Sequence, residues 1–185
     1  MDYLGDVSTE GGPFLIVDRL AFGSWRGAGD GTTALESTDY AMILAIYEGQ
    51  LAIAGRSAVA FDIAGPGTAS VFRAGTGEIV IASAFVDSDD DWAHRQRATA
   101  RKWRAISDVL GHVDVPSGDV VIIWSPVDSR DVNPFPAGVD ATRLDANAIV
   151  GLGIQVTVEP GRYVVRAGET ELDGHAGICA VVMPA

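Results

Sequence analysis

The stretch that decides the fold is Phe61–Gly75, FDIAGPGTASVFRAG. An apolar strand runs to Pro66-Gly67, and the chain then returns as a second strand that ends in Arg-Ala-Gly. A similar pattern lies at Val156–Gly168, VTVEPGRYVVRAG. Two unrelated hairpins can share such turns, because turns reuse proline and glycine. The other interpretation is that the chain contains a duplicated β-unit.

Further apolar runs extend both copies of this pattern. Phe14–Val17 and Val120–Trp124 are short and uninterrupted, which predicts buried strands. Leu51–Ile63 contains two short apolar segments around a glycine, which is typical of a hairpin. A duplication therefore predicts β-repeats at about 11–86 and 119–185.

Residues 89–110 predict the one long helix. Ser88 or Asp89 can cap its beginning, acidic residues fill its first turn and basic residues follow, which complements the helix dipole. Gly111 suits the position just after a helix. Residues 1–10 are polar and are expected to be loosely held, whereas 39–47 fit a short helix or a strand.

These elements together predict the fold class. We expect an α+β fold, mostly antiparallel β-sheet in two similar β-units that share one core, with the helix at about 89–110 joining them. A chain of 185 residues, 48% of them hydrophobic, can bury a sizeable core without disulfides. We therefore expect residues 1–185 to form a single globular domain.

The charge of the chain restricts its partners. It has 25 acidic and 13 basic side chains, a formal net charge of −12. Nucleic acids and anionic membranes require a basic face, so neither is an expected partner. An acidic surface instead attracts cationic partners. The chain begins without a recognisable signal peptide and has no apolar run of about 18 residues, so we expect a cytoplasmic protein.

No catalytic motif stands out. His94, His112 and His175 are scattered and form no metal-binding pattern. Cys179 is the single cysteine and sits in an apolar run, which favours a small buried side chain. We therefore expect no cofactor, no metal and no enzymatic activity.

The densest charge lies at the start of the predicted helix. Asp87, Asp89, Asp90 and Asp91 precede Trp92, and tryptophan is common at binding hot spots. Helix capping is one role for these carboxylates. A calcium site is another, although the spacing lacks the glycine and the terminal glutamate of an EF-hand loop. We assign these five residues as the candidate partner-binding site.

Several short motifs also carry a family resemblance. Gly11–Val17 with Trp25–Gly27, the hairpin Gly49–Phe61 and Pro160–Val165 are similar to the Imm21 family of bacterial immunity proteins, in the same order over about residues 11–167. The turn at Asp62–Pro66 departs from that family, which has a Gly-Asp-Glu-Pro-like turn there. The resemblance implies an inhibitor that binds its cognate toxin and has no catalytic residues.

Three functional hypotheses follow. The first is an immunity protein that neutralises a basic toxin through an acidic surface. The second is a small-molecule-binding protein or enzyme with a carboxylate-lined cleft between the two β-units, in which Asp128 and Asp131 act as acid–base groups. The third is an assembly subunit that pairs through an exposed strand edge.

Overall fold

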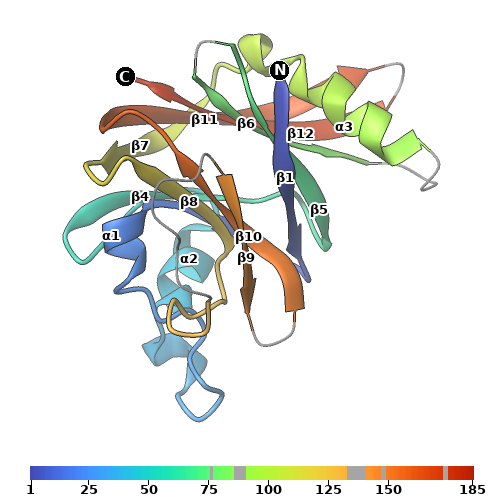
Figure 1. Cartoon of the computed structure of the whole chain (residues 1–185). Coiled ribbons are helices and arrows are strands. Elements are labelled where there is room, and N and C mark those ends of the chain that lie inside the picture. The colour runs from blue at the N-terminus through green and yellow to red at the C-terminus, as the bar shows by residue number, and fades with distance from the viewer. Residues whose placement is uncertain (76, 86–90, 133–140, 147–148, 173–174) are drawn as a thin grey trace.

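The computed structural model describes residues 1–75, 77–85, 91–132, 141–146, 149–172 and 175–185. Within these ranges, twelve strands form two antiparallel sheets of six strands each (Figure 1). Sheet A has the order β1 (Asp2–Thr9), β5 (Gly67–Arg73), β6 (Ile79–Ala84), β12 (His175–Pro184), β11 (Gly161–Leu172) and β7 (Val109–Val115). Sheet B has the order β3 (Gly49–Ile53), β4 (Arg56–Phe61), β2 (Phe14–Asp18), β8 (Asp119–Trp124), β10 (Ile149–Thr157) and β9 (Ala141–Ala146).

Short helices cover the outer faces of the two sheets. The outer face of sheet B packs against α1 (Arg19–Phe22) and α2 (Tyr40–Ile46). The outer face of sheet A packs against α3 (Trp92–Ala100) and the 3-10 turn η3 (Trp103–Ala105). In Figure 1, α3 lies across sheet A, at the opposite end of the molecule from α1 and α2. No helix in the described ranges combines the length and apolar composition that crossing a bilayer requires.

The uninterrupted apolar runs are strands that are buried on both faces. In β2, Phe14 and Ile16 face the core between the sheets, whereas Leu15 and Val17 face the helices. The same alternation holds in β8. Because side chains alternate along a strand, a strand with two covered faces has no polar positions. The prediction of buried strands at 14–17 and 120–124 is confirmed.

The two halves of the chain contribute equally to both sheets. Strands β1 to β6 come from the first half and β7 to β12 from the second, and adding six to each strand number in one half of a sheet gives the order of the other. The central ladders, β6 with β12 and β2 with β8, join the halves. The predicted α+β class, with two similar β-units around one core, is confirmed.

The correspondence extends to irregular positions. Strand β1 bulges at Leu4, just before Gly5, and β7 bulges at Leu110, just before Gly111. A Cβ on Gly5 would lie 3.2 Å from Ile154 Cδ1, and a Cβ on Gly111 would lie 3.1 Å from Val59 Cγ2. Val59 and Ile154 are themselves equivalent positions of β4 and β10, two residues before Phe61 and Val156. The same local geometry therefore occurs once in each half.

The ladder register also corrects the sequence alignment of the two copies. Val71 pairs with Gly5 and Val165 pairs with Gly111, so Val71 and Val165 are equivalent. Two residues further along their strands, Arg73 is then equivalent to Ala167. The Arg-Ala-Gly endings that make the two sequences look alike are therefore offset by one residue in the structure, where Arg73 matches Ala167 and not Arg166.

The predicted helix at 89–110 is shorter than expected. Its described part spans Trp92–Ala100, and the chain continues through η3 into β7, which contains Gly111. Trp103 and Ile106 still pack on sheet A, which explains their helical spacing. Gln96, the polar residue of the apolar stripe, is fully buried because its side chain bonds the backbone of Ala84 and of Thr68.

The two predicted repeats begin later than the structural halves do. Residues 1–10 are not loosely held, because Asp2–Thr9 forms β1 and pairs with β5. Val109–Val115 likewise forms β7 before the predicted start at 119. Neither half forms its own sheet, since each sheet takes three strands from each half. The ambiguous segment 39–47 contains the helix α2.

Candidate functional site

The structure describes only part of the predicted partner-binding site. Asp87, Asp89 and Asp90 lie outside the described residues. Asp91 is exposed, and its carboxylate lies 3.3 Å from Nε of Arg95, one turn along α3. Trp92 is partly buried beside a shallow hollow that Phe85 also lines.

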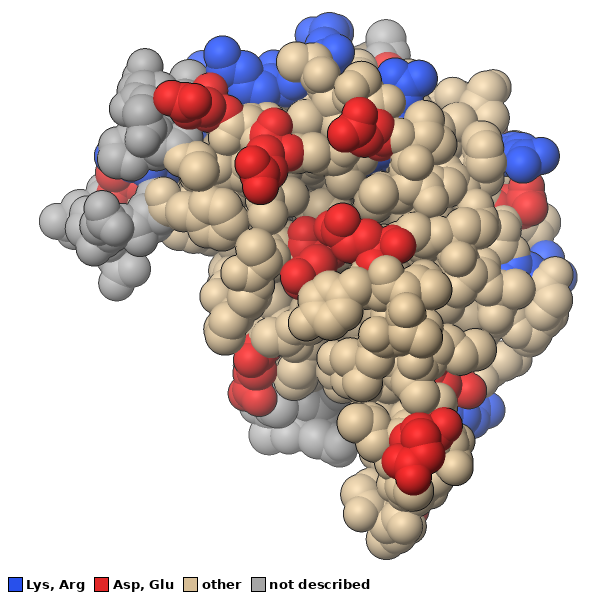
Figure 2. Space-filling view, turned by 180° about the vertical axis from the view of Figure 1, so that it is seen from behind, with Lys and Arg blue, Asp and Glu red and all other residues tan. Residues whose placement is uncertain are grey.

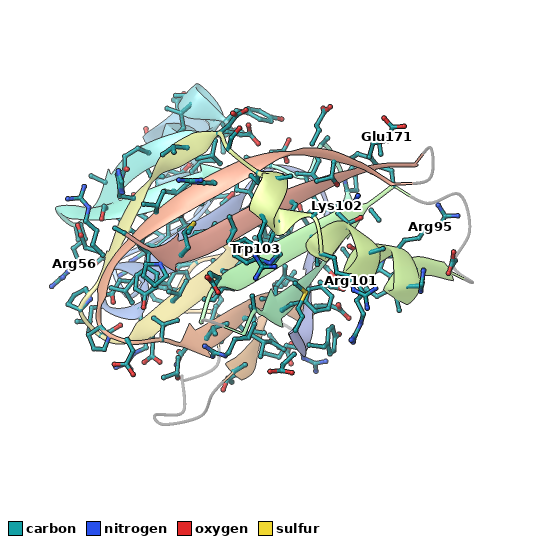
Figure 3. All side chains as sticks on the ribbon, turned by 90° about the horizontal axis from the view of Figure 1, so that it is seen from above. Arg56, Arg95, Arg101, Lys102, Trp103 and Glu171 are labelled. Atoms are coloured by element: carbon teal, nitrogen blue, oxygen red, sulfur yellow. The ribbon has the colours of Figure 1, made fainter. Side chains whose placement is uncertain are left out.

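The helix that follows these aspartates is basic. Figure 3 shows Arg95 near the start of α3 and Arg101 and Lys102 just after its end, next to Trp103, which packs against sheet A. Including Arg97 and Arg104, this short segment holds five of the chain's 13 basic residues. The charge of the molecule is therefore polarised, and the described part of the predicted acidic site lies at its basic end.

A different surface combines a hollow with negative charge. An open groove of about 690 Å³ lies between the edge of sheet B beside α2 and the part of sheet A formed by β7, β11 and β12. Among the described residues, four carboxylates line it, and Leu110, Ala167 and Ile178 add apolar surface. These carboxylates are Glu48, Asp62, Asp108 and Glu169. We call this feature the acidic groove.

In the described part of the chain, no basic side chain neutralises the groove. Among the residues that the structure describes, no lysine or arginine lies within 4 Å of its four carboxylates. Glu48 accepts a hydrogen bond from the backbone N–H of Asp62 at 3.2 Å, which joins the residue before β3 to the residue after β4 on the sheet B side of the groove. Figure 2, which views the molecule from the side where α2 lies, shows acidic side chains in the middle of the face and basic ones at its edges.

Helix α2, whose last residue Ile46 lines the groove, is unusually apolar. Helix α2 has the sequence YAMILAI, yet Ile43 is its only fully buried residue. Met42, Leu44 and Ile46 are 41, 37 and 40% exposed. A helix that is hydrophobic on all sides is ordinarily buried. Exposed apolar side chains next to a groove are typical of a surface that binds another molecule.

Backbone strain is concentrated at the same place. Tyr47 has φ 62° and ψ −53°, and the N–H of Glu48 bonds the carbonyl oxygen of Ile46 at 2.8 Å. This is a classic γ-turn, which is rare and strained for a residue with a side chain. Ala64, which also lines the groove, has φ 62°. Strained residues cluster at functional sites, and Tyr47 is 52% exposed.

The carboxylates named in the enzyme hypothesis do not line the groove. Asp128 is buried on another part of the molecule, where Arg130 bonds its carboxylate and Arg26 lies 3.8 Å away. Burial raises the pKa of Asp128, but the hydrogen bonds and charge of Arg130, with the charge of Arg26, outweigh it and lower the pKa. Asp131 is exposed. The carboxylate of Asp128 is therefore held by arginine in the ionised form and lies outside the groove.

Metal-binding groups do not converge in the described part of the chain, where no three His, Cys, Asp or Glu residues are placed to hold one ion. His94 and His112 both lie outside the lining of the acidic groove. Cys179 is buried, as predicted, and burial raises the pKa of its thiol to about 12. The thiol is therefore protonated at neutral pH and inaccessible to reagents.

Comparison of the chain with protein-family models, curated proteins and solved structures finds no match. The acidic groove therefore rests on its own geometry. Sequence reasoning missed it because its four carboxylates come from four separate segments and form no local motif. The one available signal was the apolar run Met42–Ile46, which has too many hydrophobic residues for a half-buried element.

Proposed function

We propose that this chain is a binding protein that captures and neutralises a basic protein, in the manner of a bacterial immunity protein. The observation that carries the proposal is the pairing of exposed apolar side chains on α2 with an acidic groove that no described basic residue neutralises. The resemblance to the Imm21 family supports the same function, with a toxin encoded next to the chain's gene as the partner.

The chemistry of the surface suits such a partner. A protein surface that grips a nucleic-acid substrate is basic, so an acidic inhibitor can compete with that substrate for it. Complementary charges accelerate the encounter and select the partner, while buried apolar and aromatic side chains supply much of the affinity. The groove provides the charge, and Tyr47 with its neighbours on α2 provides the apolar contact.

The test is to co-express the chain with the toxin domain encoded beside it and to measure both cell survival and the dissociation constant. Tyr47→Ala should weaken binding by about thirtyfold, the effect of losing a hot-spot side chain worth about 2 kcal/mol. The matched control is Glu159→Gln, which removes an exposed carboxylate from the β10–β11 turn, outside the groove. A toxin that binds wild type and Tyr47→Ala equally well would remove this surface from the proposal.

The small-molecule hypothesis also has one observation in its favour. The groove has the volume of an ordinary ligand site and is lined by carboxylates, as that hypothesis expected. The exposed side chains of α2 distinguish the two functions, since Met42 and Leu44 do not line the groove and a small molecule inside it leaves them in water. If Met42→Ser and Leu44→Ser leave the activity of the chain unchanged while Glu169→Gln abolishes it, the small-molecule function is favoured.

A further inference from the structure

The acidic groove, which both halves line, has a counterpart at the equivalent junction between the halves. The groove lies beside Ala167 in the middle of β11, and the equivalent residue is Arg73, the last residue of β5. Arg73 extends from sheet A toward sheet B, where its Nη2 donates a hydrogen bond to the carbonyl oxygen of Thr157 at 2.8 Å. At that junction, a guanidinium therefore spans the space between the two sheets.

The residue that receives this hydrogen bond also has an equivalent in the groove. Thr157 follows Val156 at the end of β10, and Asp62 follows Phe61 at the end of β4. Since β4 and β10 are equivalent strands, Asp62 occupies the position of Thr157. Both ends of the arginine contact thus have counterparts in the groove, but there the arginine is replaced by alanine and the acceptor residue carries a carboxylate.

From this correspondence we propose that the acidic groove receives an arginine side chain of the protein partner. The guanidinium would lie between Ala167 and Asp62, where the first half places its own. Guanidinium matches carboxylates better than an ammonium group does, because its planar set of N–H donors can bond two oxygens at once. The proposal rests on the proposed function, which it makes specific by naming the group that the groove recognises.

A titration followed by NMR tests the recognition directly. The full chain, labelled with ¹⁵N, is titrated with acetyl-Gly-Arg-Gly-amide, and the backbone amides of Glu48, Gly168 and Glu169 are followed. The arginine peptide should shift these amides at concentrations at least tenfold lower than the citrulline peptide, which has the same shape but no charge. The lysine peptide should fall between them. Equal effects of the arginine and citrulline peptides would overturn the proposal.

A designed substitution tests the correspondence itself. Ala167→Arg places an arginine at the position equivalent to Arg73. Its guanidinium should fill the groove, abolish the shifts caused by the arginine peptide and weaken partner binding at least tenfold. Ala167→Gln is the matched control, because it adds a long side chain without a charge. Ala167→Arg should melt at a higher temperature than Ala167→Gln, since only the arginine can pair with Asp62. If it melts no higher, or if the peptide still binds to it, the proposal is wrong.

A second set of variants keeps the test decisive if Ala167→Arg does not fold. Asp62→Asn and Glu169→Gln remove a charge and keep the side-chain volume nearly constant. Each should raise the concentration of arginine peptide needed for half-maximal shifts at least threefold. Glu159→Gln should leave it unchanged. Suppose that these variants bind the arginine peptide as wild type does, while Tyr47→Ala still weakens binding of the protein partner. That result would overturn arginine recognition alone and leave the proposed function standing.

Discussion

Tyr47 stores strain at the edge of the acidic groove. Its γ-turn conformation, with φ 62°, is one that a residue with a Cβ adopts at a cost of about 1–3 kcal/mol. The side chain is half exposed, so little packing offsets this cost. The strained turn places Tyr47 and the following Glu48 in the lining of the groove. Such an arrangement is expected where a residue is retained for binding and not for stability.

Glycine at position 47 should relieve this strain, and comparison with alanine at the same position measures the relief. We expect Tyr47→Gly to be more stable than Tyr47→Ala by about 1 kcal/mol, because both variants lack the ring but only glycine relieves the strain. The measurement is the free energy of unfolding in urea for both variants. A glycine variant less stable than the alanine variant would show that the turn is not strained.

Asp128 makes a second prediction at this scale, on the dependence of stability on pH. Since Arg130 and Arg26 lower the pKa of Asp128 in the folded state, the ionised carboxylate stabilises the fold above the unfolded-state pKa of about 3.9. That contribution disappears as the pH falls through the lower, folded-state pKa. In urea titrations between about pH 6 and pH 2, wild type should therefore lose stability more steeply than Asp128→Asn. Parallel curves for the two proteins would contradict the assignment.

At the scale of elements, the free edge of β7 is closed by a side chain. The amide of Gln50, from β3 of the other sheet, accepts a hydrogen bond from the N–H of His112 at 2.7 Å and donates one to its carbonyl oxygen at 2.9 Å. Ser57 bonds the N–H of Asp114 two residues further along. These contacts occupy groups that an edge strand otherwise presents to other chains. They count against an assembly role for this edge.

Loss of this side chain should loosen the edge. We expect Gln50→Ala to lower the free energy of unfolding by about 1 kcal/mol, the usual value of such hydrogen bonds near the surface. The amide of His112 should exchange its hydrogen faster, whereas the amide of Val113, which faces β11, should not. If exchange at His112 is unchanged, the Gln50 contacts do not protect the edge.

The elements that the sequence predicted well are those with local signals. The runs at Phe14–Val17 and Val120–Trp124 are so apolar that only burial on both faces explains them, and Pro66-Gly67 and Pro160-Gly161 mark the crossings between sheets. Strand β1 was missed because Asp2–Thr9 buries fully only Val7 and Thr9, too few positions for a visible pattern.

The errors near the helix and the site have a different origin. Trp103 and Ile106 fit a helix of the predicted length, and only the pairing of β7 with β11 shows that the chain has left the helix. The acidic groove is wholly non-local, since Asp62 and Glu169 meet through the packing of two sheets. A dense run such as Asp87–Asp91 attracts attention in a sequence, whereas carboxylates that converge in space do not.

At the scale of the whole molecule, two similar halves have acquired different surfaces. The central ladders and the bulges at Leu4 and Leu110 are common to both halves. The difference lies at one equivalent position of β5 and β11, where Arg73 spans the space between the two sheets and Ala167 leaves it open. The shared ladders and bulges thus stabilise both halves in the same way, whereas the groove depends on residues that differ between equivalent positions of the two halves.

This architecture predicts that neither half folds without the other. In a fragment of residues 1–107, β2 and β6 would lose β8 and β12, which pair with them along the middle of each sheet. Trp25 reports the union of the halves, because its buried indole N–H bonds the carbonyl oxygen of Ser125 at 2.9 Å. Each fragment alone should show the red-shifted emission of exposed tryptophan, and mixing 1–107 with 108–185 should restore the native emission at a 1:1 ratio.

Native emission and protease resistance of fragment 1–107 alone would show instead that one β-unit has a sufficient core of its own. The equal sharing of strands between the sheets makes that outcome unexpected, because it leaves each half with two incomplete sheets rather than one complete sheet.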